Sequence, residues 1–166
     1  MFGIREFDPV RDHDAVRSCA IELQDFEREL DPRMPPGEQI VDRYLDLMFR
    51  RCAEFDGVVL VAEADGVLTG FVSVWTRYRS SEPEDDPAEH GYVSDLVVSA
   101  KHRGRGIGRA LMRAAEARAR QAGAHTLSVS VKAGNTNALS LYSAEGFEHS
   151  AIYLEKRLEI PTIPEP

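Results

Sequence analysis

The chain has 166 residues, close to the roughly 100–200 residues of a typical single domain, so residues 1–166 are expected to form one domain with a flexible tail over residues 159–166. Its 43% hydrophobic and 29% charged residues exclude a wholly disordered chain. No apolar run reaches the about 18 residues of a membrane helix, and residues 1–6 lack the features of a signal peptide, so we expect no membrane partner. Cys19 and Cys52 show no metal-ligand spacing and are expected to be reduced core residues of a cytoplasmic protein.

The net charge of −8 conceals one basic region. Residues 101–120 carry seven Lys and Arg residues against one acid, Glu116, whereas the rest of the chain is strongly acidic. A compact positive region on an acidic protein favours a small anionic ligand over a nucleic acid. A solvated helix face is the alternative explanation of the same charges.

The first half of the chain contains short strands and amphipathic helices. A strand is expected over residues 3–7, and apolar residues at helical spacing predict a helix over residues 12–30. The Pro- and Gly-containing segment 31–37 ends that helix, and a second amphipathic helix follows, with a buried stripe from Ile40 to Cys52. An apolar run predicts a buried strand over residues 57–63, and Asp65-Gly66 predicts a hairpin turn to a strand over residues 67–78, in which Gly70 indicates a bulge.

The second half begins with an acidic loop over residues 80–90, which is expected to be solvated and mobile. Strands are expected over residues 92–98, 126–131 and 152–158, and helices within residues 103–122 and over residues 137–145. Gly123 stands where a glycine commonly ends a helix. This order of elements predicts a mixed α/β (α+β) domain with helices packed on a central sheet.

The most informative segment is the glycine-rich turn from Arg103 to Arg109, which lies between a predicted strand and a predicted helix. Glycines let the backbone approach a ligand closely, and the following helix N-terminus adds partial positive charge. The turn is therefore predicted to bind a phosphate group, with the arginines as countercharges. It is not a Walker A loop, because Gly-Lys-Ser/Thr is absent, and it is not a dinucleotide fingerprint, because Arg109 or Leu111 stands where the third glycine is required.

Two motifs of the chain resemble the GNAT superfamily of acyl-CoA N-acyltransferases. The turn is similar to the R/Q-x-x-G-x-G/A loop of that family, and the segment from Asn135 to Phe147 keeps every spacing of its N-x-x-A-x-x-L-Y-x-x-x-G-F motif. The strand and hairpin from Ala62 to Phe71 also fit, so the resemblance covers residues 4–158. It implies a mostly antiparallel central sheet flanked by helices, with strands that splay apart at an acetyl-CoA site.

The resemblance implies acetyl-CoA as co-substrate and no metal. Its diphosphate would be held by the backbone of Arg103, Gly104, Arg105, Gly106, Ile107, Gly108 and Arg109. Its pantetheine arm would meet main-chain groups of Leu96, Val97 and Val98, whose side chains are expected to be core. Asn135 matches an asparagine that contacts the cofactor in the family, and Asn137 is expected to be the N-cap of the next helix.

The resemblance also assigns a general acid. Tyr142 matches family tyrosines that stand near the thioester sulfur and are proposed to protonate the departing thiolate. A weak acid held close to a leaving group contributes about 10²–10⁴-fold to the rate. The alternative is a core aromatic residue beside Leu139 and Phe147.

The general base is less well marked. Some members of the family carry a glutamate at the position of Ser94, which this chain lacks. Asp95 is the first candidate, but strand alternation puts residues 94 and 95 on opposite faces unless a bulge turns the chain. Glu27 and Glu63 are the further candidates.

The leading hypothesis is therefore an N-acetyltransferase in which a primary amine attacks the thioester directly. Acidic residues at positions 25, 27, 29 and 82–89 would suit a cationic amine, or are only a solvated surface. A non-catalytic acyl-CoA-binding or sensing module is the second hypothesis: the missing glutamate at position 94 leaves room for it, whereas the intact Tyr142 argues against it. A nucleic-acid binder is not supported, because the net charge has the wrong sign. Many relatives are homodimers, but the sequence identifies neither the acceptor nor the oligomeric state.

Overall fold

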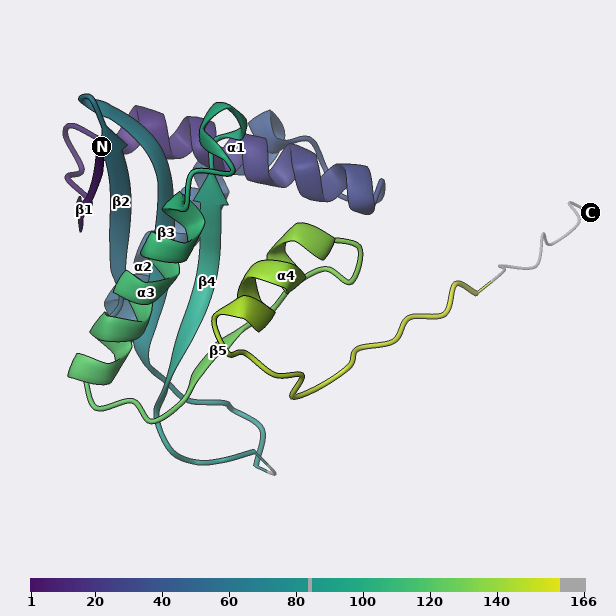
Figure 1. Cartoon of the computed structure of the whole chain (residues 1–166). Helices are drawn as coiled ribbons and strands as arrows, with labels where there is room; N and C mark the ends of the chain where they lie inside the picture. The colour runs from purple at the N-terminus through teal and green to yellow at the C-terminus, as the bar shows by residue number, and fades with distance from the viewer. Residues whose placement is uncertain (84, 159–166) are drawn as a thin grey trace, which may run out of the picture.

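The computed structural model describes residues 1–83 and 85–158 and places a five-stranded sheet between layers of helices (Figure 1). The strands are β1 (Phe2–Glu6), β2 (Val58–Ala64), β3 (Val67–Tyr78), β4 (His90–Val98) and β5 (Leu127–Val129). The helices are α1 (His13–Leu30), α2 (Gly37–Glu54), α3 (Ile107–Gln121) and α4 (Thr136–Ala144), with a 3₁₀ turn, η1 (Ala100–His102), before α3. The predicted mixed α/β class is confirmed. The tail over residues 159–166, expected to be flexible, lies outside the described residues.

The strands follow one another across the sheet in chain order. Strands β1 to β4 pair antiparallel with their neighbours, and β5 lies parallel to β4. Asp65 and Gly66 form the predicted hairpin turn with φ angles of 51° and 78°. The pairing of β2 with β3 shifts beside Gly70, as the predicted bulge requires. A Cβ at Gly70 would lie 2.4 Å from the Val97 carbonyl oxygen, so glycine is what allows β3 and β4 to pair there.

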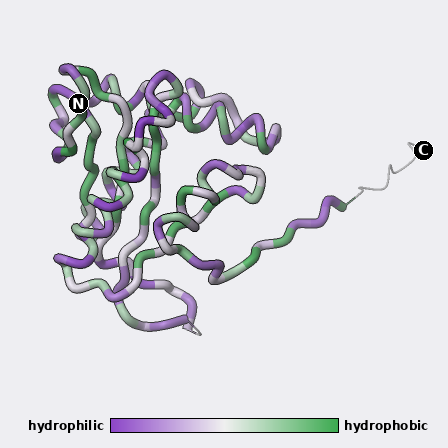
Figure 2. Tube along the Cα trace, viewed as in Figure 1, coloured by the Kyte–Doolittle hydropathy of each residue, from purple (hydrophilic) through white to green (hydrophobic). Residues whose placement is uncertain are grey.

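The helices cover the two faces of the sheet and give the domain two cores. On one face, α1 and α2 pack on Val61, Phe71 and Val97, and both cysteines lie in this core as free thiols. On the other face, the apolar side of α3 packs on Val72 and Val74. Figure 2 shows hydrophobic residues following the strands between these layers. Among the described residues, no helix is long and apolar enough to span a membrane.

Strand β4 carries two irregularities that shape the site. Asp95 pairs with Ser73 and Val93 pairs with Val74, so Ser94 is an extra residue in β4 and forms a bulge. The pairing of β4 with β5 covers Gly91 to Val93 and stops there, while β4 continues to Val98. The strands therefore diverge at the bulge, as the resemblance implied, and one edge of residues 94–98 is left without a strand partner.

The predicted strand over residues 152–158 is wrong. These residues run away from the sheet without pairing with any described strand (Figure 1). Ile152, Tyr153, Leu154 and Leu158 are 78%, 88%, 85% and 79% exposed. Alternation of residues satisfies the period of a strand, but a strand also needs hydrogen bonds to a neighbouring strand, and residues 152–158 make none with the strands of the described sheet.

Candidate functional site

The glycine-rich turn forms a cradle of backbone amides at the N-terminus of α3. Gly104 and Gly106 have φ angles of 74° and 79°, in the left-handed region where other residues are strained, and nothing lies within 4 Å of the position of either Cβ. Ala110 donates its N–H to the Gly106 carbonyl at 3.0 Å, whereas the amides of residues 107–109 find no acceptor among the described residues. Free amides and the helix dipole make this turn suited to a phosphate group.

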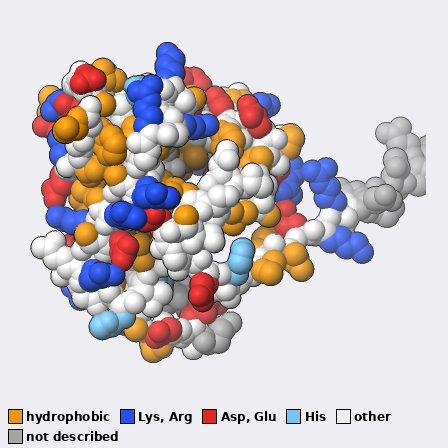
Figure 3. All heavy atoms as spheres, viewed as in Figure 1, with side chains coloured by type: hydrophobic (Ala, Val, Ile, Leu, Met, Phe, Trp, Pro, Cys, Tyr) orange, Lys and Arg blue, Asp and Glu red, His pale blue; other side chains and the backbone are white. Residues whose placement is uncertain are grey.

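The arginines around the turn have different environments. The Arg103 side chain donates from Nε to the Val98 carbonyl at 3.0 Å, and its guanidinium lies 5.6 Å from the ring centre of Phe26. Arg109 instead pairs with Glu145 at 2.8 Å, which offsets part of its charge. Lys and Arg side chains gather on this face over the turn and α3 (Figure 3). The region is positive, and Arg103 fastens the turn to the end of β4.

The free edge of β4 leads from the turn toward the interior. Val97 is 3% exposed and packs in the core beneath α1 and α2, while Leu96 and Val98 are partly buried on the opposite face. Their side chains are core, as predicted, so what they offer a ligand is backbone. Beyond Val93, the main-chain groups on the β5 side have no strand partner. An extended ligand can therefore pair with this edge as a strand would.

Asp95 lies where the strands diverge and is 8% exposed. Because of the bulge at Ser94, Asp95 shares the face of Val97, toward α1, and not that of Val93. The Ser94 hydroxyl donates to its carboxyl at 2.7 Å. Burial, followed by the negative charge of Glu27, raises the pKa of Asp95 to about 7. A carboxyl group with that pKa can exchange a proton near neutral pH.

Tyr142 occupies α4 and is 9% exposed, with its ring centre 5.7 Å from that of Phe147. Its hydroxyl has no hydrogen-bond partner among the described residues and is not sealed from the surface. Burial, with the charges of Glu27 and Asp95, raises the pKa of Tyr142 to about 12. The phenol therefore keeps its proton at neutral pH, which a general acid requires.

The two further candidates for the base have different outcomes. Glu27, on α1, lies near both groups, and its own burial raises its pKa. Glu63 is excluded by its place in the fold: it pairs with Arg5 at 2.7 Å and Arg11 at 2.6 Å, beside β1, and these guanidiniums lower its pKa. Sequence reasoning did not identify Lys132, which no motif marks. Its positive charge offsets part of the increase that burial causes in the pKa of Glu27.

The capping of α4 differs from the prediction. Asn135, not Asn137, is the N-cap, and its Oδ1 accepts from the Ala138 amide at 3.1 Å. The helix begins one residue earlier than expected, so Asn137 lies within it and is exposed. Spacing alone does not separate the two asparagines, since each has an amide three positions later that its side chain could bond. The side-chain amide nitrogen of Asn135 is not used by this cap.

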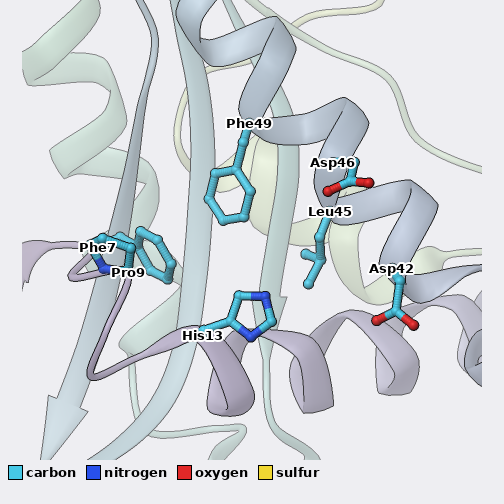
Figure 4. A pocket seen from close by; sticks show the side chains of 7 residues that line it. All are labelled: Phe7, Pro9, His13, Asp42, Leu45, Asp46 and Phe49. Carbon is cyan, nitrogen blue, oxygen red and sulfur yellow. The ribbon is translucent and has the colours of Figure 1, made fainter.

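A separate hollow of about 290 Å³ lies beside β1, between α1 and α2. Phe7, His13 and Phe49 line it together with two carboxylates of α2, Asp42 and Asp46 (Figure 4). None of the predicted site residues borders it. Among residues 1–83 and 85–158, no group of three or more His, Cys, Asp or Glu could hold a metal ion.

Comparison with known proteins adds an independent line of evidence. A model of the acetyltransferase (GNAT) family matches residues 23–147. An aminoglycoside N(6')-acetyltransferase type 1 of Stenotrophomonas maltophilia is 30% identical over 122 residues, covering 71% of this chain and 78% of that protein. An uncharacterised N-acetyltransferase of Bacillus subtilis is 30% identical over 112 residues, covering 67% and 72%. A mycothiol acetyltransferase of Sanguibacter keddieii is 32% identical over 96 residues, but these cover 58% of this chain and 30% of that longer protein.

Solved structures share the fold. A GCN5-related N-acetyltransferase from Ralstonia eutropha superposes with a TM-score of 0.72 at 20% identity, covering 95% of this chain and 99% of that one. An aminoglycoside N-acetyltransferase in complex with CoA superposes with a TM-score of 0.64 at 21% identity, covering 94% and 100%. At these identities the likeness concerns the architecture.

Proposed function

This chain belongs to the GNAT acetyltransferase family and is an acyltransferase, and we propose that it transfers an acetyl group from acetyl-CoA to a primary amine by direct attack. The observation that carries the proposal is the arrangement along β4. The free amides of the turn at Gly104 are followed along β4 by an unpaired strand edge and then by Asp95. Tyr142, from α4, is the second group that can exchange a proton there. This order matches the diphosphate, pantetheine and thioester of acetyl-CoA.

In this proposal, each part of the co-substrate has its own backbone or side-chain partner. The backbone of residues 103–109 holds the diphosphate through the amides of residues 104–109, because the Arg103 amide donates to the Ala100 carbonyl at 3.4 Å. The main chain of Leu96, Val97 and Val98 pairs with the pantetheine arm. The free side-chain amide of Asn135 contacts the co-substrate beside α4. The thioester is then directed to the point where β4 and β5 diverge.

The reaction needs two proton transfers. Asp95, ionised above a pKa of about 7, accepts a proton from the bound ammonium group, directly or through water. The free amine attacks the thioester carbonyl, and the carbon–sulfur bond breaks. Tyr142 gives its proton to the departing thiolate and regains one from the nitrogen that has attacked. The products are an amide and CoA thiol, and Asp95 returns its proton to solvent.

The proposed acceptor is a cationic amine. Glu27 and Asp95 place two carboxyl groups at the proposed thioester position, and the chain has a net charge of −8. The names of matched relatives include an aminoglycoside acetyltransferase and an L-amino acid N-acyltransferase, and both classes of substrate carry amines. The buried free thiols are in keeping with a cytoplasmic protein, which we also propose.

Release of free thiol from acetyl-CoA, measured with a panel of polyamines, aminoglycosides, amino acids and short peptides, tests the function. Tyr142→Phe should lower kcat by about 10²–10⁴-fold and leave the affinity for acetyl-CoA unchanged, because it removes only the acid. Tyr44→Phe, on α2, is the matched control and should retain full activity.

A non-catalytic binding module would give another result. Acetyl-CoA would raise the melting temperature of the protein, but no amine of the panel would release thiol, and Tyr142→Phe would behave as the parent. If acetyl-CoA gave no stabilisation at all, the co-substrate assignment itself would be wrong.

A further inference from the structure

A cluster of aromatic rings lies on the face of the sheet that α1 and α2 cover. The ring centres of Trp75, Tyr78 and Tyr92 are 4.9, 5.3 and 5.5 Å apart, and we call these three residues the aromatic wall. Trp75 also packs against Phe55 at 5.2 Å and against the core beneath α1 and α2, so its ring is held in place. Its indole Nε1 is buried and has no hydrogen-bond partner among residues 1–83 and 85–158. Because a buried donor without an acceptor is unfavourable, the ring of Trp75, and not its N–H, is what this position uses.

The register of the sheet puts the aromatic wall next to Asp95. Tyr92 pairs with Trp75 and Asp95 pairs with Ser73, and residues 73 and 75 share one face of β3. The bulge at Ser94 therefore brings Tyr92 and Asp95 onto the same face of β4. Two residues of a strand span about 7 Å, and this is the spacing between the Tyr92 and Asp95 positions along the sheet.

The Tyr92 ring lies at the opening between β4 and β5. Its hydroxyl donates to Ser130 Oγ at 3.1 Å, and Ser130 follows directly after the last pair of the two strands, Val93 with Val129. Trp75 stacks on the ring from the β3 side, with 27° between the two planes, so the other face of the ring is turned toward the opening. Tyr92 is partly buried and belongs to neither hydrophobic core of the described residues. A flat apolar surface therefore borders the point where the strands diverge.

The Tyr92 side chain is also close to the proposed acid. Its charge, after burial and the charges of Glu27 and Asp95, is one of the causes that raise the pKa of Tyr142. Tyr92 thus lies near both groups that are proposed to exchange protons with the substrates. An amine that attacks the thioester between Asp95 and Tyr142 would bring its carbon skeleton against the free face of the Tyr92 ring.

The charges around this point favour an acceptor with one positive charge over one with several. The Lys132 Nζ lies 3.6 Å from the Asp31 carboxylate, and its charge also acts on Glu27. The two carboxyl groups of α1 and its C-cap are therefore partly neutralised, and Asp95 has no cationic partner among the described residues. One ammonium group at Asp95 satisfies this arrangement.

We propose that the aromatic wall binds the carbon skeleton of the acceptor, and that the acceptor is an arylalkylamine in which two or three atoms separate the nitrogen from a flat ring. The inference rests on the proposed function, because that function puts the nitrogen at Asp95. A tether of this length, together with the ring, covers the about 7 Å between the Asp95 and Tyr92 positions. Two rings stacked with an offset attract each other beyond the area that they bury, so a flat acceptor binds better than a saturated one of the same size.

Thiol release with two matched amines tests the wall. 2-Phenylethylamine and 2-cyclohexylethylamine have the same tether and a similar size, but only the first has a flat ring. The parent protein should prefer 2-phenylethylamine in kcat/KM by about 3–10-fold. Tyr92→Leu should abolish this preference by raising the KM for the aromatic amine, while the KM for acetyl-CoA stays the same. Tyr92→Phe keeps the ring and should keep the preference.

The fluorescence of Trp75, the only tryptophan of the chain, measures binding at the wall without any turnover. Titration with 2-phenylethylamine in the presence of CoA should change the emission until it saturates, because the ligand stacks on the ring that Trp75 covers from behind. The dissociation constant should be about 3–10-fold lower than that of 2-cyclohexylethylamine, and Tyr92→Leu should remove the difference. Cooperative unfolding, followed by circular dichroism, shows that each variant is folded.

The outcomes separate this inference from the proposed function. If other amines release thiol while 2-phenylethylamine neither reacts nor alters the emission of Trp75, the inference is wrong and the proposed function stands. A preference for 1,4-diaminobutane that Tyr92→Leu leaves unchanged would also overturn the inference. If 2-phenylethylamine binds with the expected preference but no amine of any class releases thiol, the wall is confirmed as a site for aromatic amines and the proposed function is wrong.

Discussion

Replacing Asp95 with asparagine should stabilise the folded protein while it removes the proposed base. The carboxyl group is buried, and its pKa of about 7 means that ionising it is unfavourable in the folded state. Asparagine has a similar shape and carries no charge. Its side-chain oxygen can still accept the hydrogen bond that Ser94 donates to Asp95 at 2.7 Å.

The sign and size of the effect follow from the shift in pKa. Between the ordinary value of 3.8 and the folded value of about 7, the folded protein holds a proton that the unfolded chain has lost. The contribution of Asp95 to the free energy of unfolding therefore falls as the pH rises through this interval. One pKa unit corresponds to about 1.4 kcal/mol, so the variant should gain up to about 4 kcal/mol at pH 8, and almost nothing near the lower limit.

Urea denaturation of the parent and Asp95→Asn, carried out near pH 3.8 and at pH 8, measures the difference. Asp46→Asn is the control, because Asp46 is an exposed carboxylate on α2 and its replacement should have little effect at either pH. Thiol-release activity of Asp95→Asn should fall by about 10²-fold or more. The reasoning would be refuted if the variant were less stable than the parent at pH 8. It would also be refuted if the two free energies of unfolding differed by the same amount at both pH values.

Three further substitutions test the scaffold of the site. Gly106→Ala forces a side chain into the left-handed region at φ 79° and should lower the free energy of unfolding in urea by about 1 kcal/mol. It should also weaken the binding of acetyl-CoA measured by calorimetry. The control Gly3→Ala, in open space on β1, should change neither quantity. Gly70→Ala places a Cβ 2.4 Å from a carbonyl oxygen of β4 and should cost about 1–3 kcal/mol, and an unchanged melting temperature would contradict the close pairing. Arg5→Met leaves the 2% exposed Asp12 without its guanidinium and should lower the free energy of unfolding in urea by about 3–5 kcal/mol at neutral pH. Because Arg5 lowers the pKa of Asp12, the difference from the parent should shrink as the pH falls below the ordinary pKa of Asp12; a difference that stays the same would contradict a role for this ion pair.

Features that one short segment determines were predictable from the sequence. The hairpin at Asp65-Gly66 and the turn at Gly104 and Gly106 depend on backbone angles that these residues adopt readily, and all four have positive φ angles. The amphipathic helices follow from the spacing of their own apolar residues. The glycine motif, the tyrosine of α4 and the order of elements were enough to identify the family before any coordinates.

Features that depend on a partner far away in the chain were not predictable in the same way. The alternation over residues 152–158 is that of a strand, but no residue in that segment specifies the strand with which it would pair. The bulge at Ser94 could be named only as a condition, because bulges depend on the pairing of both strands. Likewise, Glu27 could be offered as one carboxylate among several, and its approach to Asp95 comes from the packing of α1 against the sheet.

The bulge and the divergence of β5 occur at the same point of β4, and the proposed chemistry depends on both. Without the extra residue Ser94, the side chain of Asp95 would share the face of Val93 and point toward α3. With it, Asp95 faces α1 and Glu27, while Tyr142 belongs to the core on the opposite face. A continuous sheet would separate the two groups, yet the charge of Asp95 raises the pKa of Tyr142. The opening between β4 and β5 is therefore what lets an acid from one face and a base from the other act on one thioester.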